Sequence, residues 1–211
     1  MLNDINLPLI LVAAFVASAS PGPATMALAG TSMKSGRKYG LALAAGIATG
    51  SLIWSVSAAF GLAAVMMANA WLFEIVRYFG AAYLLYLAYK SLRSAFKSGD
   101  VESGGMKTAS MRAAYGKGLA IHLTNPKAIL FFGSLYSLGI PSGASPQTLL
   151  LVIGSVFTLS VIVFHGYALM FSSARVTAGY VKLRRWFEGV FALGFGIAGA
   201  KILTTSIVTA E

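Results

Sequence analysis

The chain has 211 residues and a mean hydropathy of +0.77, with 57% hydrophobic and only 10% charged residues. Soluble domains carry about 25% charged residues, so this composition excludes an ordinary soluble domain and indicates an integral membrane protein. Since the sequence contains no cysteine, disulfides, thiolate metal sites and thiol redox chemistry are excluded. The net charge of +10 would suggest nucleic acid for a soluble protein, but membrane orientation explains it better here.

Six apolar segments are long enough for a helix of about 20 residues, the length that crosses a bilayer. They cover residues 7–30, 41–68, 71–92, 118–138, 148–171 and 186–208. We therefore expect an all-α integral membrane protein with six transmembrane helices. The first segment resembles a secretory signal up to Ala19, but Asp4 precedes it without any Lys or Arg and Pro21 follows at once, so we expect it to be retained.

The first apolar segment is interrupted by the run Ser20-Pro21-Gly22-Pro23-Ala24-Thr25. A proline lacks the backbone donor and clashes with the preceding turn, so a helix stops or kinks there. In a membrane the freed carbonyls are tolerated only against protein or a water-filled cavity. Exposed carbonyls of this break, with the hydroxyls of Ser20 and Thr25, would suit an ammonium group or a coupling ion. The alternative is a proline kink that shapes packing only.

The fourth segment is interrupted in the same way, at Asn125 and Pro126. Counted along a helix from Gly118, Lys127 would lie about 14 Å deep, close to the membrane midplane. An ammonium there is costly, so we expect it to face a cavity or a partner. A half-helix starting at Asn125 would add free N–H groups and a positive dipole end that suit a carboxylate. Alternatively, Lys127 snorkels to the interface and Asn125 merely caps the helix.

Paired breaks in the two halves of a membrane chain predict the substrate site of a secondary transporter. His122 lies three residues before Asn125, on the same helix face, and is the candidate for carrying a coupled proton; the alternative is a hydrogen-bonded packing residue. We predict no catalytic residue, no cofactor and no metal, because metal-ligand clusters, a phosphate-binding loop and an activated nucleophile are missing from the sequence. The predicted substrate-binding residues are Ser20, Pro21, Gly22, Pro23, Thr25, Asn125, Pro126 and Lys127.

Basic residues alternate between the connections of the six segments. The second and fourth connections contain no Lys or Arg, so the positive-inside rule places the first, third and fifth in the cytoplasm and both termini outside. If the segment around Pro21 re-enters instead of crossing, the chain has five spans and an inner N-terminus. The residues of the basic connections are Lys34, Arg37, Lys38, Arg93, Lys97, Lys107, Arg112, Lys117, Arg175, Lys182, Arg184 and Arg185.

The longest connection, residues 94–115, contains Gly, Ser and several charges and is typical of a flexible linker. It divides the chain into a first three-helix repeat, residues 1–93, and a second, residues 116–211. Because each half holds an odd number of spans, the two repeats would be inverted relative to each other, with helices 1 and 4 broken.

Three motifs in this order resemble the lysine exporter (LysE/RhtB) family. They are Ser-Pro-Gly-Pro at 20–23, Gly-Ala-Ala-Tyr-Leu-Leu-Tyr-Leu at 80–87, and Leu-Thr-Asn-Pro-Lys-Ala at 123–128 followed by Phe131 and Phe132. The resemblance implies a small export carrier for amino acids or their derivatives, coupled to the proton gradient, and maps Pro21, Gly22, Pro23, Asn125, Pro126 and Lys127 onto shared motif positions. The chain departs from many members after the third motif, at residues 134–138, and carries Ser51 and Ser160 where many have an aspartate.

We therefore expect a secondary active exporter of amino acids in the bacterial inner membrane, working by alternating access. The expected partners are a zwitterionic amino acid, a proton as coupling ion and the lipid bilayer, with no nucleic acid and with a homodimer as an open option. The alternatives are an exporter of another small solute or cation, and a non-transporting membrane scaffold.

Overall fold

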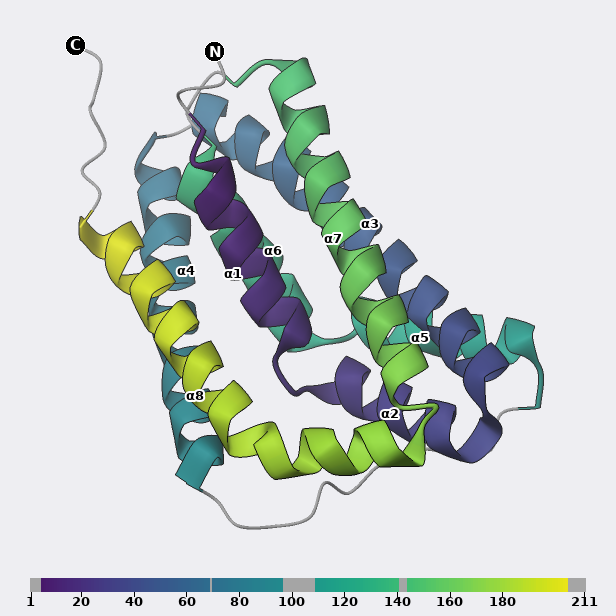
Figure 1. Cartoon of the computed structure of the whole chain (residues 1–211). Helices are drawn as coiled ribbons and strands as arrows, with labels where there is room; N and C mark the ends of the chain where they lie inside the picture. The colour runs from purple at the N-terminus through teal and green to yellow at the C-terminus, as the bar shows by residue number, and fades with distance from the viewer. Residues whose placement is uncertain (1–4, 69, 97–108, 141–143, 205–211) are drawn as a thin grey trace.

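The computed structural model describes residues 5–68, 70–96, 109–140 and 144–204. The secondary structure of these residues is entirely α-helical (Figure 1). The helices are α1 (Leu7–Ala19), α2 (Pro23–Ser35), α3 (Arg37–Ala68), α4 (Ala70–Phe96), α5 (Met111–Leu123), α6 (Pro126–Gly139), α7 (Pro146–Met170) and α8 (Ala174–Thr204).

Short polar residues followed by proline set several of the helix starts. The side chain of Asn6 accepts a hydrogen bond from the Leu9 N–H at 3.3 Å and begins α1. Ser145 accepts one from the Thr148 N–H at 3.3 Å and begins α7, with Pro146 in the first turn. Such caps satisfy donors that a helix leaves free, and a proline in the first turn has no donor to lose.

Both predicted breaks are confirmed. The first apolar segment is divided between α1 and α2, which meet at an angle of 52°. The fourth is divided between α5 and α6, with Thr124 and Asn125 between them. In each case the helix that follows the break begins with a proline, Pro23 or Pro126.

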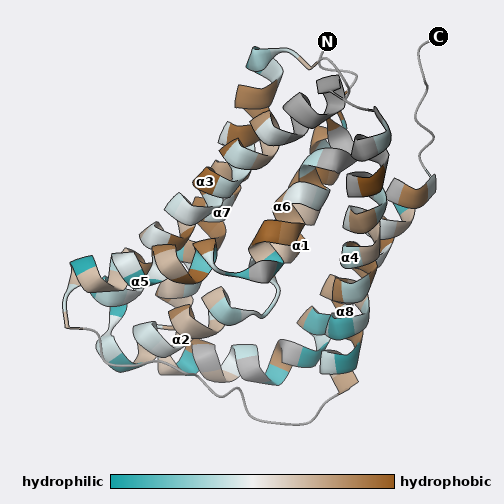
Figure 2. Ribbon diagram, turned by 180° about the vertical axis from the view of Figure 1, so that it is seen from behind, coloured by the Kyte–Doolittle hydropathy of each residue, from teal (hydrophilic) through white to brown (hydrophobic). Residues whose placement is uncertain are grey.

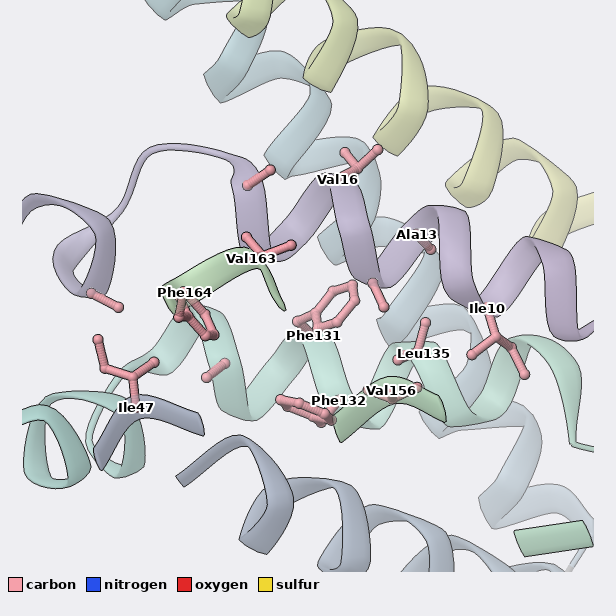
Figure 3. Close-up of a cluster of buried hydrophobic side chains, with 14 of the residues drawn as sticks. Ile10, Ala13, Val16, Ile47, Phe131, Phe132, Leu135, Val156, Val163 and Phe164 are labelled. Carbon is pink, nitrogen blue, oxygen red and sulfur yellow. The ribbon is translucent and has the colours of Figure 1, made fainter. Parts of the chain in front are cut away.

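The two half-helices α1 and α6 lie in the middle of the bundle (Figure 1). On one side of them α4 packs against α8, and on the other side α3 packs against α7. A core of apolar side chains fills the space between α1, α6 and α7, including Ile10, Phe131, Phe132, Leu135, Val156 and Phe164 (Figure 3). The breaks at the ends of α1 and α6 therefore lie inside the bundle.

The position of α5 differs from the one assumed when the depth of Lys127 was counted along a single helix. In Figures 1 and 2, α5 lies across one end of the bundle and α6 turns steeply away from it. It packs closely on the first half of α3, because Gly46 and Gly118 bring the two backbones together: a Cβ on Gly118 would lie 2.2 Å from the Leu43 carbonyl oxygen. The depth of Lys127 therefore cannot be counted along a single helix from Gly118.

By length and hydropathy, two of the described helices can each cross a membrane, namely Arg37–Gly61 of α3 and all of α7. The bent pair of α1 and α2 qualifies as a third if it forms one span. The chain is thus an all-α protein with two or three such candidate spans among its described residues. The arrangement of six spans as an inverted repeat stays a prediction.

The prediction that the basic residues lie in loops is wrong for the described ones. Lys34 lies in the last turn of α2, and Arg37 and Lys38 lie in the first turn of α3. Only Gly36 separates the two helices. Likewise Arg93 belongs to α4, Arg112 and Lys117 to α5, and Arg175, Lys182, Arg184 and Arg185 to α8. Lys and Arg are good helix formers, so helices continue past their apolar stretches. Lys97 and Lys107 lie outside the described residues.

The predicted linker is helical at both ends, because α4 continues to Phe96 and α5 begins at Met111. Residues 97–108 lie outside the described part, and the division into two repeats stays a prediction. Several basic helix ends share one end of the bundle, where α2 meets α3 and where α8 begins (Figure 1). In Figure 2, which colours each residue by hydropathy, the most hydrophilic residues of the bundle lie toward that end.

Candidate functional site

A cavity that is partly open to solvent lies where the two breaks meet. Most of the residues predicted from sequence line this one cavity: Ser20, Gly22 and Thr25 from the first break, and His122, Asn125 and Lys127 from the second.

The prolines have a different place from these residues. Neither Pro21 nor Pro23 lines the cavity; Pro21 is half-buried and Pro23 is exposed in the first turn of α2. Pro126 opens α6, and its side chain is outside the described part of the structure. The prolines thus determine where the helices stop, while their neighbours supply the polar groups of the cavity.

The end of α1 leaves carbonyl groups that its own helix cannot satisfy, and other elements fill part of that need. The Ser20 N–H donates to the Val16 carbonyl at 2.9 Å, and the Ser20 hydroxyl donates to the Ala17 carbonyl at 3.1 Å. The Tyr167 hydroxyl of α7 donates to the Ala19 carbonyl at 2.7 Å. The first break is therefore held by contacts that reach across the bundle.

The Ser20 carbonyl is the acceptor for Lys127. The Lys127 ammonium donates to this oxygen at 3.3 Å and also contacts the Ser20 hydroxyl. Thr25 donates its hydroxyl to the same carbonyl at 3.4 Å, and the Phe195 ring centre lies 5.9 Å from the Lys127 ammonium, within the range of a cation–π contact. The charge of Lys127 therefore points into the first break.

Asn125 caps the second break by itself. Its side-chain oxygen accepts from the Lys127 N–H at 3.0 Å, and its carbonyl accepts from the Ala128 N–H at 2.9 Å and the Ile129 N–H at 3.1 Å. By contrast, α2 begins at Gly22 with no side-chain cap. The helix start available to an anion is thus that of α2, whereas the sequence predicted that of α6.

His122 is 5% exposed, and neither of its ring nitrogens has a hydrogen-bond partner among the described residues. Its ring stands edge-on to Phe132 at 6.3 Å and to Phe164 at 5.9 Å between ring centres. His165 differs, since its Nδ1 lies 2.9 Å from the Val161 carbonyl of its own helix and it is not in the cavity wall. The alternative of a hydrogen-bonded packing histidine therefore does not describe His122.

Two further polar residues of the wall, Ser51 on α3 and Ser160 on α7, were noticed in the sequence only as departures from a family pattern. Their hydroxyl oxygens are 2.8 Å apart, although 109 residues separate them. One turn further along α3, Ser55 contacts the Tyr136 hydroxyl of α6, and both are fully buried. The signal in the sequence that could have pointed to these residues was a hydroxyl group inside a strongly apolar helix. The sequence alone does not show which hydroxyls contact each other.

A family model described as LysE type translocator matches residues 15–206. The chain belongs to the LysE family. It is similar to the threonine efflux protein of Salmonella typhimurium, with 33% identity over 189 residues that cover 86% of this chain and 91% of the relative. The threonine efflux protein of Escherichia coli strain K12 is 30% identical over 187 residues, with the same two shares, 86% and 91%.

The leucine efflux protein of Enterobacter sp. strain 638 is 33% identical over 197 residues, which cover 92% of this chain and 90% of the relative. No solved structure matches the chain. Membership of the LysE family confirms the resemblance drawn from the three motifs, and it makes the chain a membrane translocator and not an enzyme.

Proposed function

We propose that this LysE-family chain is a secondary active exporter of amino acids or close derivatives across the bacterial inner membrane. The proposal is supported by relatives named threonine and leucine efflux proteins, and by a cavity with polar residues at two helix breaks. The observation that carries it is the contact between Lys127 and Ser20, which joins the two broken helices through an ammonium and a backbone carbonyl.

The ammonium of Lys127 occupies the position that a substrate ammonium would take. A zwitterionic amino acid places its amine on the Ser20 carbonyl, displaces Lys127, and offers that lysine its own carboxylate. The uncapped start of α2, at Gly22, adds backbone donors and the positive end of a helix dipole to the carboxylate. Each ammonium therefore keeps an acceptor, and no buried charge is left without a partner.

This exchange would also break a link between the halves of the protein, because Ser20 lies in the first proposed repeat and Lys127 in the second. We propose six spans arranged as two inverted repeats, residues 1–93 and 116–211, which rock around the cavity. We propose that the buried contact between Ser55 and Tyr136, one turn of α3 beyond Ser51, acts as a gate. The basic helix ends would face the cytoplasm.

His122 is the proposed carrier of the coupled proton. It is buried in the cavity wall, and its ring nitrogens have no hydrogen-bond partner among the described residues, so a proton arriving there is next to the substrate. A neutral imidazole has an acceptor nitrogen that can take up a proton. The rival of a metal exporter is disfavoured because no cluster of three or more His, Asp or Glu able to hold a metal occurs in the described residues. A non-transporting scaffold predicts no gradient-driven flux.

The test is uptake of radiolabelled threonine and leucine into proteoliposomes with and without a pH gradient. Lys127→Met removes a charge-assisted hydrogen bond worth about 1.5–3 kcal/mol, so we expect transport to fall about 10- to 100-fold. Lys182→Met, an exposed lysine of α8, is the matched control and should transport normally. Equal transport by wild type and Lys127→Met would overturn the site, and no flux of either amino acid by wild type would overturn these substrates.

A further inference from the structure

We propose that Ser51, Ser160 and His122 form a side-chain subsite that selects amino acids with a small, uncharged, hydroxyl-bearing side chain. This inference rests on the proposed function and extends it from the backbone of the substrate to its side chain. The three residues come from α3, α7 and α5 and line the same cavity as Lys127.

The hydroxyls of Ser51 and Ser160 differ in their hydrogen bonding from neighbouring hydroxyls on the same helices. Thr49 donates to the Ala45 carbonyl at 3.0 Å, and Thr158 donates to the Gly154 carbonyl at 2.8 Å, so each is satisfied within its own helix. Ser51 and Ser160 are 1% and 2% exposed and contact each other at 2.8 Å. That one bond uses one of their two hydroxyl hydrogens, which leaves a donor and several lone pairs for a ligand.

His122 adds to this unused capacity. A neutral imidazole has one N–H donor and one acceptor nitrogen, and neither has a partner in the described part of the chain. Buried polar groups without partners are costly, so a ligand that supplies partners is favoured over one that does not. A hydroxyl on the ligand can both donate and accept a hydrogen bond, and this part of the cavity wall offers both acceptors and donors.

The remaining wall limits the side chain in size and charge. Phe132 and Phe164 stand edge-on to His122, and Val156 also lines the cavity. None of the residues that line the cavity carries a carboxylate, and one of them, Lys127, carries a positive charge. A cationic side chain would thus enter next to a like charge with no carboxylate in the cavity wall, which disfavours it.

The measurement is competition: unlabelled threonine, valine and lysine compete with labelled threonine in proteoliposomes of wild type and of Ser51→Ala/Ser160→Ala. Threonine and valine have the same shape and differ by one hydroxyl against one methyl. We expect wild type to prefer threonine over valine about tenfold, the worth of one to two hydrogen bonds, and to bind lysine more weakly than either. In the double variant the threonine-to-valine ratio should fall to about one.

Ser57→Ala removes an exposed hydroxyl of the same helix α3 and should leave the ratio at its wild-type value. Equal affinity of wild type for threonine and valine would overturn the subsite while leaving amino-acid export intact. An unchanged ratio in the double variant would overturn it as well. Loss of all amino-acid flux in wild type would instead count against the proposed function, so the two failures are distinguishable.

Discussion

The two helix breaks are built from the same kinds of residues but are completed in different ways. At the second break Asn125 caps α6 locally, through contacts within four residues. At the first break the Ala19 carbonyl accepts from Tyr167, and the Ser20 carbonyl accepts from Lys127 and from the nearby Thr25. Tyr167 and Lys127 are more than 100 residues away, and α2 starts without a side-chain cap.

The difference indicates which break responds to a ligand. A locally capped helix start has little to gain from a new partner, whereas an uncapped start and a carbonyl held by a distant lysine can exchange partners. We infer that the second break is structurally fixed and holds Lys127 in place. The first break then forms the surface that binds the substrate.

The largest effect on this comparison is expected from removing the local cap. Asn125→Ala leaves a donor of α6 unmet inside the cavity wall, so it should lower the free energy of unfolding by about 0.5–2 kcal/mol. Asn125→Ser, which can cap in the same way, should restore most of that loss. Thermal unfolding of the purified variants measures both. If Asn125→Ala and Asn125→Ser unfold alike, the cap is not what fixes the second break.

A smaller effect is expected from making the first break resemble the second. Gly22→Ser supplies a capping hydroxyl to α2, and the Gly22 backbone is extended, with φ −173°, so serine fits without strain. Stability should rise by only a few tenths of a kcal/mol, while the apparent affinity for amino acid falls because the hydroxyl occupies the donors of α2. Gly22→Ala, with no capping group, is the control for added bulk. Undiminished affinity in Gly22→Ser would remove α2 from the carboxylate site.

The sequence predicted where the helices stop, because proline acts on its own backbone and needs no partner. It also predicted most of the polar cavity wall, since Ser20, Asn125 and Lys127 neighbour those prolines. It did not predict that Lys127 meets Ser20, that α5 lies across the bundle, or that Ser51 and Ser160 pair. These depend on contacts between helices far apart in the chain. The misplaced basic loops have the same origin, as hydropathy marks apolar stretches and not helix ends.

The central claim is that an amino acid binds between the two breaks and needs Lys127 to do so. The natural chain contains no cysteine, so a single Ser18→Cys in the half-buried cavity wall reports on occupancy through its alkylation rate. A saturating amino-acid substrate should slow alkylation of Ser18→Cys, but should not slow it in Ser18→Cys/Lys127→Met or at Ser57→Cys. Equal alkylation of Ser18→Cys with and without the amino acid, in protein that still transports it, would contradict the claim.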